Sequence, residues 1–432
     1  MSLSDGAYSS VVAGSKSTLV PGRLIQLLLL AVGMAAGGYV RTEISPLQEA
    51  LAAALSITDN QMAVLQGPLI GIPVTLAAIP LGLVIDRYSR VRLLFALVAL
   101  SCIGSLITAF APNFTALLLT RGLTGLVGLC TIPVSYSLLA DLFPPDQRGR
   151  ATTVICIGQL AGISAAFAWG GKLLAVSESG PYGWKAATLW MTLPLAMAVL
   201  FMLGLREPQR RGAPDAPVRA SHARAAFRRL RSIVGPLVVG VVLVETAVGA
   251  ILIWATPMLS RNFALPPDRV GAIMALTTAV GGTVGPILGG PLADFCQRTG
   301  GPRRTFMVLS ALAVMSAPTD LFAFVSGDTT TSVLLIVAMT SLQTLAVTGM
   351  TLFTVVTPGE CRGLFMSVWV GINLFFVFAI APVTVSILST VMGGPGLIGQ
   401  ALSTVCVASS LLAATSFVLG AKNMSRMDLQ VR

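Results

Sequence analysis

Long apolar runs dominate this chain and limit what it can fold into. A helix that crosses a bilayer needs about 20 consecutive apolar residues, and runs of that length follow one another along the 432 residues. Pro and Gly inside them are compatible with membrane helices, because neighbouring helices satisfy the freed backbone groups. The sequence therefore predicts an all-α integral membrane protein with twelve transmembrane helices, at 24–45, 62–85, 91–111, 114–140, 151–174, 185–205, 235–257, 269–293, 303–325, 331–355, 361–390 and 396–420.

Charged residues make up only 10% of the chain, whereas an ordinary soluble domain carries about 25%. So few charges exclude a soluble enzyme, a secreted domain held by disulfides and a disordered chain. The six cysteines are scattered singly, and the one histidine, His222, lies in a polar stretch. The sequence also lacks nucleophile, metalloprotease and phosphate-loop motifs. We therefore expect no metal, no cofactor, no catalytic residues and no enzyme activity.

The basic residues predict the orientation. If both termini are cytoplasmic, 22 of the 28 Lys and Arg residues lie in cytoplasmic segments, and one, Arg121, lies inside a span. This asymmetry follows the positive-inside rule. It also explains the net charge of +11 without a nucleic-acid partner. We expect a multi-pass protein of the inner (plasma) membrane. Five basic residues remain for the outer side: Arg41, Lys172, Lys185, Arg261 and Arg269.

A basic segment at 206–234 divides the chain into two halves. It contains eight arginines, so we interpret it as a solvated cytoplasmic linker. Its second half could instead form an amphipathic helix on anionic headgroups. The predicted organisation is a tail (1–23), a six-helix bundle (24–205), this linker (206–234), a second six-helix bundle (235–420) and a tail (421–432).

The two halves repeat each other. Gly82, Asp86 and Arg90 recur 208 residues later as Gly290, Asp294 and Arg298. A repeat of this length in a membrane chain indicates a duplicated six-helix unit, as in many secondary transporters. A second echo pairs Asp146, Arg148 and Gly149 with Glu360, Arg362 and Gly363, 214 residues apart.

The segment Gly82-Leu-Val-Ile-Asp86-Arg87-Tyr-Ser-Arg90-Val-Arg92 resembles the signature between helices two and three of the major facilitator superfamily. Arg121-Gly-Leu-Thr-Gly125 resembles an element in that family's fourth helix. The stretch from Arg121 to Arg150 is also similar to the spinster-like and organic anion symporter branches. The resemblance implies two pseudo-symmetric six-helix bundles that alternate access to a central site by a rocker-switch motion.

The signature has a physical interpretation as a conformational latch. Asp86 can pair with Arg90 and cap a neighbouring helix, and Gly82 would permit close helix contact. Alternatively, the arginines only set topology. The predicted latch residues are Gly82, Asp86, Arg87, Arg90, Arg92, Gly290, Asp294, Arg298, Arg148 and Arg362.

Charges inside spans are costly and usually functional. Glu245 lies near the predicted midplane, where desolvation favours the protonated carboxyl, so it is our candidate for proton coupling or substrate binding; the alternative is a structural role with a buried polar partner. Arg41 and Arg121 could bind an anionic substrate, or Arg121 could tune a nearby acid. Glu43 is two residues from Arg41, so the two side chains point to different sides. It could instead reach the outer headgroups.

The neutral candidates are polar side chains at interior depth. Each could contact substrate or form a hydrogen bond between helices. They are Tyr136, Gln159, Gln343 and Asn373.

These features predict a monomeric secondary transporter for a small amphiphilic or anionic organic solute, coupled to protons and surrounded by membrane lipid. A proton-driven exporter of drugs or lipids is an alternative. A channel-like facilitator or a membrane receptor without active coupling belongs to a different class and would not need a duplicated latch.

Overall fold

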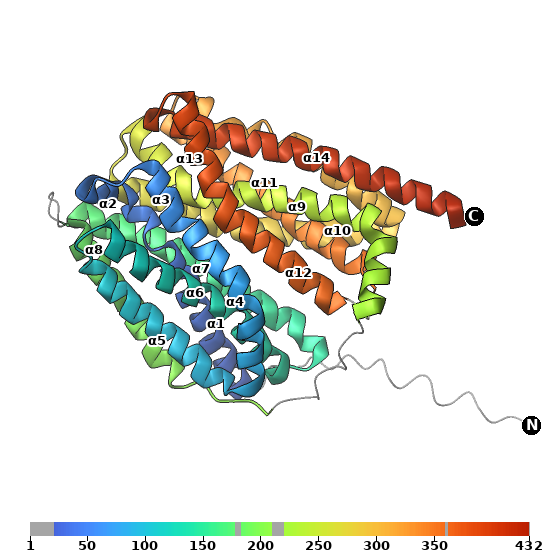
Figure 1. Ribbon diagram of the computed structural model, residues 1–432, viewed down its shortest axis with the longest axis horizontal. Helices are drawn as coiled ribbons and strands as arrows, with labels where there is room; N and C mark the ends of the chain where they lie inside the picture. Colours follow the sequence, from blue (N-terminus) through green and yellow to red (C-terminus); the bar gives the residue numbers. More distant parts are fainter. Residues whose placement is uncertain (1–20, 178–182, 210–219, 359–361, 432) are drawn as a thin grey trace, which may run out of the picture.

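The computed structural model of the protein describes residues 21–177, 183–209, 220–358 and 362–431. All regular structure in these ranges is helical, which confirms the predicted all-α fold. Figure 1 shows the helices of the first half gathered on one side of the molecule and those of the second half on the other. The longer helices of the first half are α1 (Pro21–Thr42), α4 (Pro68–Arg87), α5 (Arg90–Ala109), α6 (Phe114–Leu142), α7 (Pro145–Val176) and α8 (Gly183–Met202), with short α2 (Gln48–Leu55) and α3 (Asp59–Gln66) between α1 and α4.

The second half is built from longer and more interrupted helices. α12 and α13 are joined by a π-helical segment, η4 (Phe375–Ile380), so the three form one interrupted helix. The α-helices of this half are α9 (Ala220–Phe263), α10 (Pro267–Ser316), α11 (Asp328–Val356), α12 (Arg362–Leu374), α13 (Ala381–Met392) and α14 (Ile398–Val431).

Ten helices of the described ranges are long and apolar enough to cross a membrane, or eleven if one pair bent by 54° is a single span. α10 contains the predicted span 269–293 and the first part, to Ser316, of the predicted span 303–325. Gly301 breaks the helix between them with a φ of 65°, a conformation that favours glycine. The count of twelve spans therefore stays a prediction.

The helices extend beyond the predicted bundle boundaries. α9 begins at Ala220, within the predicted linker 206–234, and continues without a break into the predicted seventh span. α14 continues to Val431, through most of the predicted tail. The middle of the linker, 210–219, and the tail 1–20 lie outside the described residues.

Two apolar clusters form the core. One lies within the first half, around Leu30, Val98 and Leu138. The other fills the second half and also takes in Leu51 and Met62, from the short helices after α1. The first half thus shares a core with the second at the end of the molecule where α2 and α3 lie.

The two ends of the molecule differ in how closely the halves approach. We call the end where α1 begins and α4 ends the basic end. We call the opposite end, where α2 and α3 lie, the clamp end, after the ion pairs of Arg261 with Glu49 and Asp59. Figure 1 shows the halves side by side near α2, α3 and α13 and diverging towards the start of α1 and the end of α14. Near the clamp end, a Cβ added to Gly171 on α7 would lie 2.9 Å from the Cα of Gly271 on α10. The helices of the two halves therefore touch backbone to backbone there.

The signature glycines at the basic end have no such contact. A Cβ added to Gly82 or to Gly290 would meet nothing within 4 Å. The prediction that Gly82 serves a close helix approach is therefore wrong for this structure, because the neighbouring helix ends stand apart.

Candidate functional site

A central cavity of about 310 Å³ lies between the two halves. α1 and α7 line it from the first half, and α9, α10, α11, α12 and η4 line it from the second. Most of its wall is apolar. Five predicted site residues come together here: Arg41, Gln159, Glu245, Gln343 and Asn373.

Arg41 and Glu245 bring opposite charges to this cavity from different halves. Arg41 lies in the last turn of α1, where a cation is favoured by the helix dipole. Glu245 lies in the middle of α9, and the two charges interact electrostatically. The Arg41 guanidinium also lies 5.3 Å from the centroid of the Phe378 ring. The site therefore combines a basic and an acidic side chain, one from each half, with an aromatic, apolar wall.

Arg121 does not line this cavity. Its side chain, 1% exposed, donates a hydrogen bond to the Val40 carbonyl at 2.8 Å and another to the Arg41 carbonyl. These are among the last carbonyls of α1, which have no partner within their own helix. Arg121 thus fixes the backbone that carries Arg41, which is a positioning role.

Glu43 is buried, with 1% of its surface exposed, and accepts a hydrogen bond from the Ser105 hydroxyl on α5 at 2.8 Å. The alternative in which Glu43 reaches the headgroups is therefore wrong. The expected divergence of Arg41 and Glu43 is confirmed, because Arg41 faces the cavity and Glu43 faces α5.

Tyr136 contacts one residue of the cavity wall. Its hydroxyl lies 3.2 Å from the sulfur of Cys156, which lines the cavity, while Tyr136 itself is 37% exposed. The structure therefore places it one residue away from the site.

Sequence reasoning missed the π-helical segment η4 and with it Phe378. Pro382, one turn later, has no N–H to donate to the Phe378 carbonyl, which favours a local departure from α-helix. The Pro382 carbonyl accepts a hydrogen bond from the Trp254 indole at 3.0 Å, which fixes the segment against α9. A proline after the aromatic run Phe375-Phe-Val-Phe378 was the available signal.

At the basic end, Arg90 organises what we call the Arg90 cluster, which also contains Asp141, Glu207, Ser89 and Ser137. The Arg90 guanidinium lies 2.5 Å from the Asp141 carboxylate and 3.2 Å from that of Glu207. It also donates to the Ser137 carbonyl at 3.2 Å. The carboxylates that Arg90 contacts thus come from α6 and from the segment after α8.

Glu207 accepts several of the hydrogen bonds in the cluster. It accepts from the Ser89 hydroxyl at 2.6 Å and from the Val91 N–H at 2.9 Å. Partial burial alone would raise the pKa of Glu207, but these bonds and those from Arg90 outweigh it and hold the pKa below its ordinary value. Glu207 begins the predicted linker, so this part of the linker is fixed to the first half.

The other predicted latch residues are spread along the basic end. Asp86 and Arg87 are exposed in the last turn of α4, and Arg92 is exposed at the start of α5. Arg148 donates to the carbonyls of Phe143 and Ala140 and so completes the end of α6. The remaining predicted latch residues lie on the part of α10 before Gly301 and at the first residue of α12. They are Gly290, Asp294, Arg298 and Arg362.

The clamp end contains a cluster that the sequence did not indicate. Arg261, in the last turn of α9, donates four hydrogen bonds of 2.8–2.9 Å to the carboxylates of Glu49 and Asp59. We call these three residues the clamp. The carboxylates lie in the first turns of α2 and α3, where helix dipoles favour anions. Arg261 belongs to the second half, so the clamp ties the halves together.

One further hydrogen bond crosses between the halves near the clamp. The Ser386 hydroxyl on α13 donates to the Asn60 side chain on α3 at 2.6 Å. Within the described ranges, no group of three or more His, Cys, Asp or Glu side chains could hold a metal ion.

Comparison with known proteins identifies relatives of this chain. The family model described as Major Facilitator Superfamily matches residues 27–256. A triacylglyceride transporter of Mycobacteroides abscessus is 32% identical over 223 residues, which are 51% of this chain and 41% of that protein. Protein spinster homolog 1 of Bos taurus is 29% identical over 284 residues, 61% of this chain and 52% of that protein. The chain thus spans about half, or less, of the length of these relatives.

A solved structure has the same fold over almost the whole chain. It is the crystal structure of a bacterial homolog of the human lysosomal transporter Spinster, in an inward-facing and unoccupied conformation. The TM-score is 0.78 at 19% identity, and the likeness covers 94% of this chain and 98% of that one.

Proposed function

The chain belongs to the Major Facilitator Superfamily, and from that premise we propose that it is a proton-coupled secondary transporter of a small amphiphilic organic anion. It is a multi-pass membrane transporter and not an enzyme. The observation that carries the proposal is the meeting of Arg41 and Glu245, one from each half, in one apolar cavity.

The substrate class follows from the cavity wall. The half-buried Arg41 guanidinium can bind carboxylate, sulfonate or phosphate groups through charge-assisted hydrogen bonds, and Phe378 with its apolar neighbours suits an alkyl or aryl body. The cavity volume of about 310 Å³ is at the lower limit of ligand pockets, so the solute is small. A relative named for a triacylglyceride supports an apolar body for the solute.

Proton coupling follows from competition for Arg41. Burial disfavours the Glu245 carboxylate, and without solute Arg41 opposes this effect by electrostatic attraction across the cavity. When an anion binds Arg41, Glu245 loses that stabilisation in a poorly hydrated site and takes up a proton. Anion and proton then bind together, which makes the protein a symporter.

Alternating access supplies the motion. The clamp joins the halves at one end, and the signature glycines stand apart at the other, so this conformation opens towards the basic end. We propose that the basic end faces the cytoplasm of the inner membrane and that a monomer suffices. In the opposite conformation the clamp separates, and the signature around Asp86 closes the cytoplasmic side.

Transport of octane-1-sulfonate into proteoliposomes tests the coupling. This anion stays ionised, so any pH dependence belongs to the protein. We expect it to accumulate on the alkaline side of an imposed pH difference. Glu245→Gln fixes a neutral group and should abolish this accumulation while it preserves exchange at equal pH. Leu252→Ala, at an apolar position of the same cavity, is the control that should keep the pH response.

The binding of two matched ligands, octane-1-sulfonate and octane-1-sulfonamide, tests the anion site. Octane-1-sulfonamide has the same chain without the charge. Arg41→Gln should weaken sulfonate binding by tenfold or more, since hydrogen bonds to charged groups contribute about 1.5–3 kcal/mol, and should leave sulfonamide binding nearly unchanged. Both affinities can be obtained from ligand-dependent thermal shifts. Accumulation by Glu245→Gln under a pH difference alone, or equal losses for both ligands, would contradict the proposal.

A further inference from the structure

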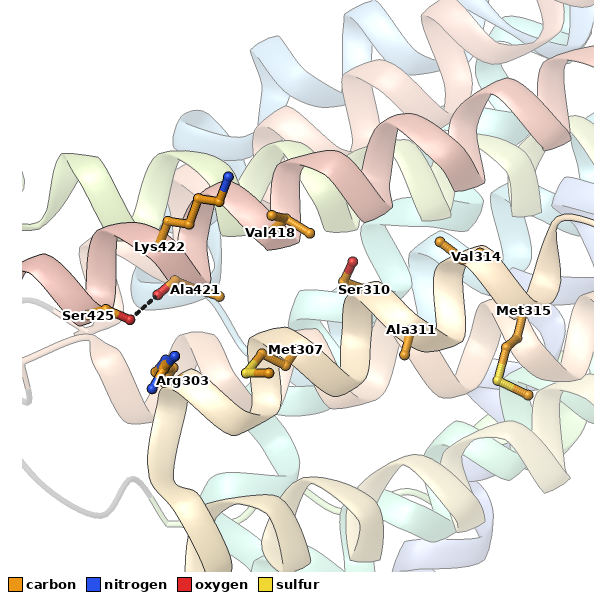
Figure 2. A pocket seen from close by; sticks show the side chains of 10 residues that line it. All are labelled: Arg303, Met307, Ser310, Ala311, Val314, Met315, Val418, Ala421, Lys422 and Ser425. Atoms are coloured by element: carbon orange, nitrogen blue, oxygen red, sulfur yellow. Dashed lines mark hydrogen bonds between the residues drawn. The ribbon is translucent and has the colours of Figure 1, made fainter.

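A second cavity, of about 610 Å³, shares no lining residue with the transport site and lies between α14 and the part of α10 that follows Gly301 (Figure 2). Figure 2 shows Arg303 and Lys422 at one end of this groove and Val314 and Met315 at the other. Its wall is apolar apart from the two cations and two serines. The groove therefore has a charged end and an apolar length.

The floor of the groove is fixed by close contacts between the two helices. The Ser310 hydroxyl donates to the Ala414 carbonyl at 3.0 Å. A Cβ on Gly420 would collide with the Phe306 ring, so the helix backbone lies directly against that ring. These contacts hold the helices together below the groove, and the groove itself stays open to the surroundings of the bundle.

The groove has the length of one lipid leaflet. Arg303 and Met315 are twelve residues apart on one helix, which is about 18 Å along its axis. Half of the hydrocarbon thickness of a bilayer is about 15 Å. Met307, Val314 and Met315 are 51–71% exposed along this length. An acyl chain of the leaflet at the basic end would therefore lie against them from headgroup depth to the midplane.

The charged end suits an anionic headgroup. Arg303 and Lys422 are exposed and come from different helices, so together they flank the mouth of the groove. Arg304, the next residue, points elsewhere, because its guanidinium lies 5.3 Å from the Phe295 ring centroid. A headgroup phosphate would bring a negative charge between the two cations, whereas a second copy of the chain in a two-fold arrangement would add two more positive charges.

We propose that this groove binds one anionic phospholipid, with its phosphate between Arg303 and Lys422 and an acyl chain along Met307 to Met315. The proposal is independent of the substrate of the central cavity.

Native mass spectrometry of the full chain, exchanged into equal amounts of dioleoyl phosphatidylglycerol and dioleoyl phosphatidylcholine, tests the headgroup. A cation near the membrane surface changes anionic-lipid binding by about fivefold. We therefore expect a preference for phosphatidylglycerol that falls about 25-fold in the Arg303→Gln, Lys422→Gln double variant. Arg304→Gln is the matched control and should keep the preference. An unchanged preference in the double variant, or an equal loss in Arg304→Gln, overturns the proposal.

A second variant tests the acyl chain. Val314→Trp fills the groove with both cations intact, and it should lower the retained lipid severalfold. Inorganic phosphate should not displace the lipid, because the acyl chain contributes to binding. Undiminished lipid in Val314→Trp, displacement by phosphate, or a dimer that the groove variants dissociate would each overturn the proposal.

Discussion

Two arginines, one at each end of the molecule, each bind two carboxylates, but they connect different things. Arg90 joins α5, α6 and the segment after α8, all within the first half. Arg261 joins α9 of the second half to α2 and α3 of the first. The Arg90 side chain is 5% exposed and that of Arg261 is 20% exposed.

Because of this difference, we expect one arginine to affect the stability of the protein and the other to affect its conformational change. An ion pair within one half moves with it as a rigid unit, whereas an ion pair between the halves has to break when they rock. Removing one partner of a buried pair is strongly destabilising because a charge is left without compensation. A partly hydrated pair separates at lower cost, since water replaces its partner. We therefore expect the Arg90 cluster to hold the first half together and the clamp to control opening.

The largest effect should come from Arg90→Ala. It leaves Asp141 and Glu207 without their guanidinium, and loss of one partner of a buried pair costs about 3–5 kcal/mol. The free energy of unfolding should fall by about 3 kcal/mol. Thermal unfolding followed by tryptophan fluorescence measures this, since the chain has five tryptophans.

Arg90→Ala should also leave the opening equilibrium unchanged, because Arg90 joins only elements of the first half. Spin labels at Pro112→Cys and Thr330→Cys, two exposed positions on different halves, report the distance across the clamp end. If Arg90→Ala changed the distribution of this distance without lowering stability, the assignment of Arg90 to stability would be wrong.

The architecture was predictable because apolar runs, positive-inside asymmetry and an internal repeat all report on bilayer crossing. Details that depend on packing were not. The sequence predicts Gly82 at a close contact, yet the structure leaves open space there, because the distance between the halves depends on the conformation. It places the end of the first bundle near 205, yet Glu207 is fixed to α5 by hydrogen bonds.

The central cavity was predictable in part for a similar reason. Polar residues such as Arg41 and Glu245 stand out in apolar spans, so five of the predicted residues indeed share one cavity. The sequence did not predict the clamp, because its two carboxylates lie in short helices 212 and 202 residues away from Arg261 in the chain. Charges outside the spans look alike in sequence, and only the fold pairs them.

A smaller effect, on conformation instead of stability, should follow from Arg261→Ala. It removes four hydrogen bonds to Glu49 and Asp59. We expect the state with the clamp end open to gain about 2 kcal/mol relative to this one, within the range for hydrogen bonds to charged groups, which is about a thirtyfold shift in population. The distance between labels at Pro112→Cys and Thr330→Cys should lengthen.

Arg269→Ala is the matched control for the clamp. Arg269 also lies at the clamp end and pairs with Asp328 at 3.1 Å, but both residues belong to the second half. Its loss should leave the label distance unchanged. Equal lengthening in both variants would mean that any charge at this end affects opening, and the distinction between pairs within and between halves would fail.

The smallest effect concerns Glu207 and its dependence on pH. The pKa of this carboxyl is lowered in the folded protein by hydrogen bonds from Ser89, Val91 and Arg90 that outweigh its partial burial. A lowered folded-state pKa contributes stability that is fully present above the unfolded pKa and is lost as the pH falls through the folded one. Because 35% of the side chain is exposed, the contribution should be about 0.5–1 kcal/mol.

Glu207→Gln should therefore be less stable than the wild type at pH 7, and the difference should shrink as the pH falls below about 4, near the ordinary pKa of glutamate. Ser89→Ala, which removes the 2.6 Å donor but no charge, should show part of the same difference with the same pH dependence. Neither variant should alter the label distance across the clamp end. A stability difference for Glu207→Gln that stays constant from pH 7 to pH 3.5 would show that the carboxylate's charge does not hold the cluster, and that Arg90 stabilises the first half through Asp141 alone.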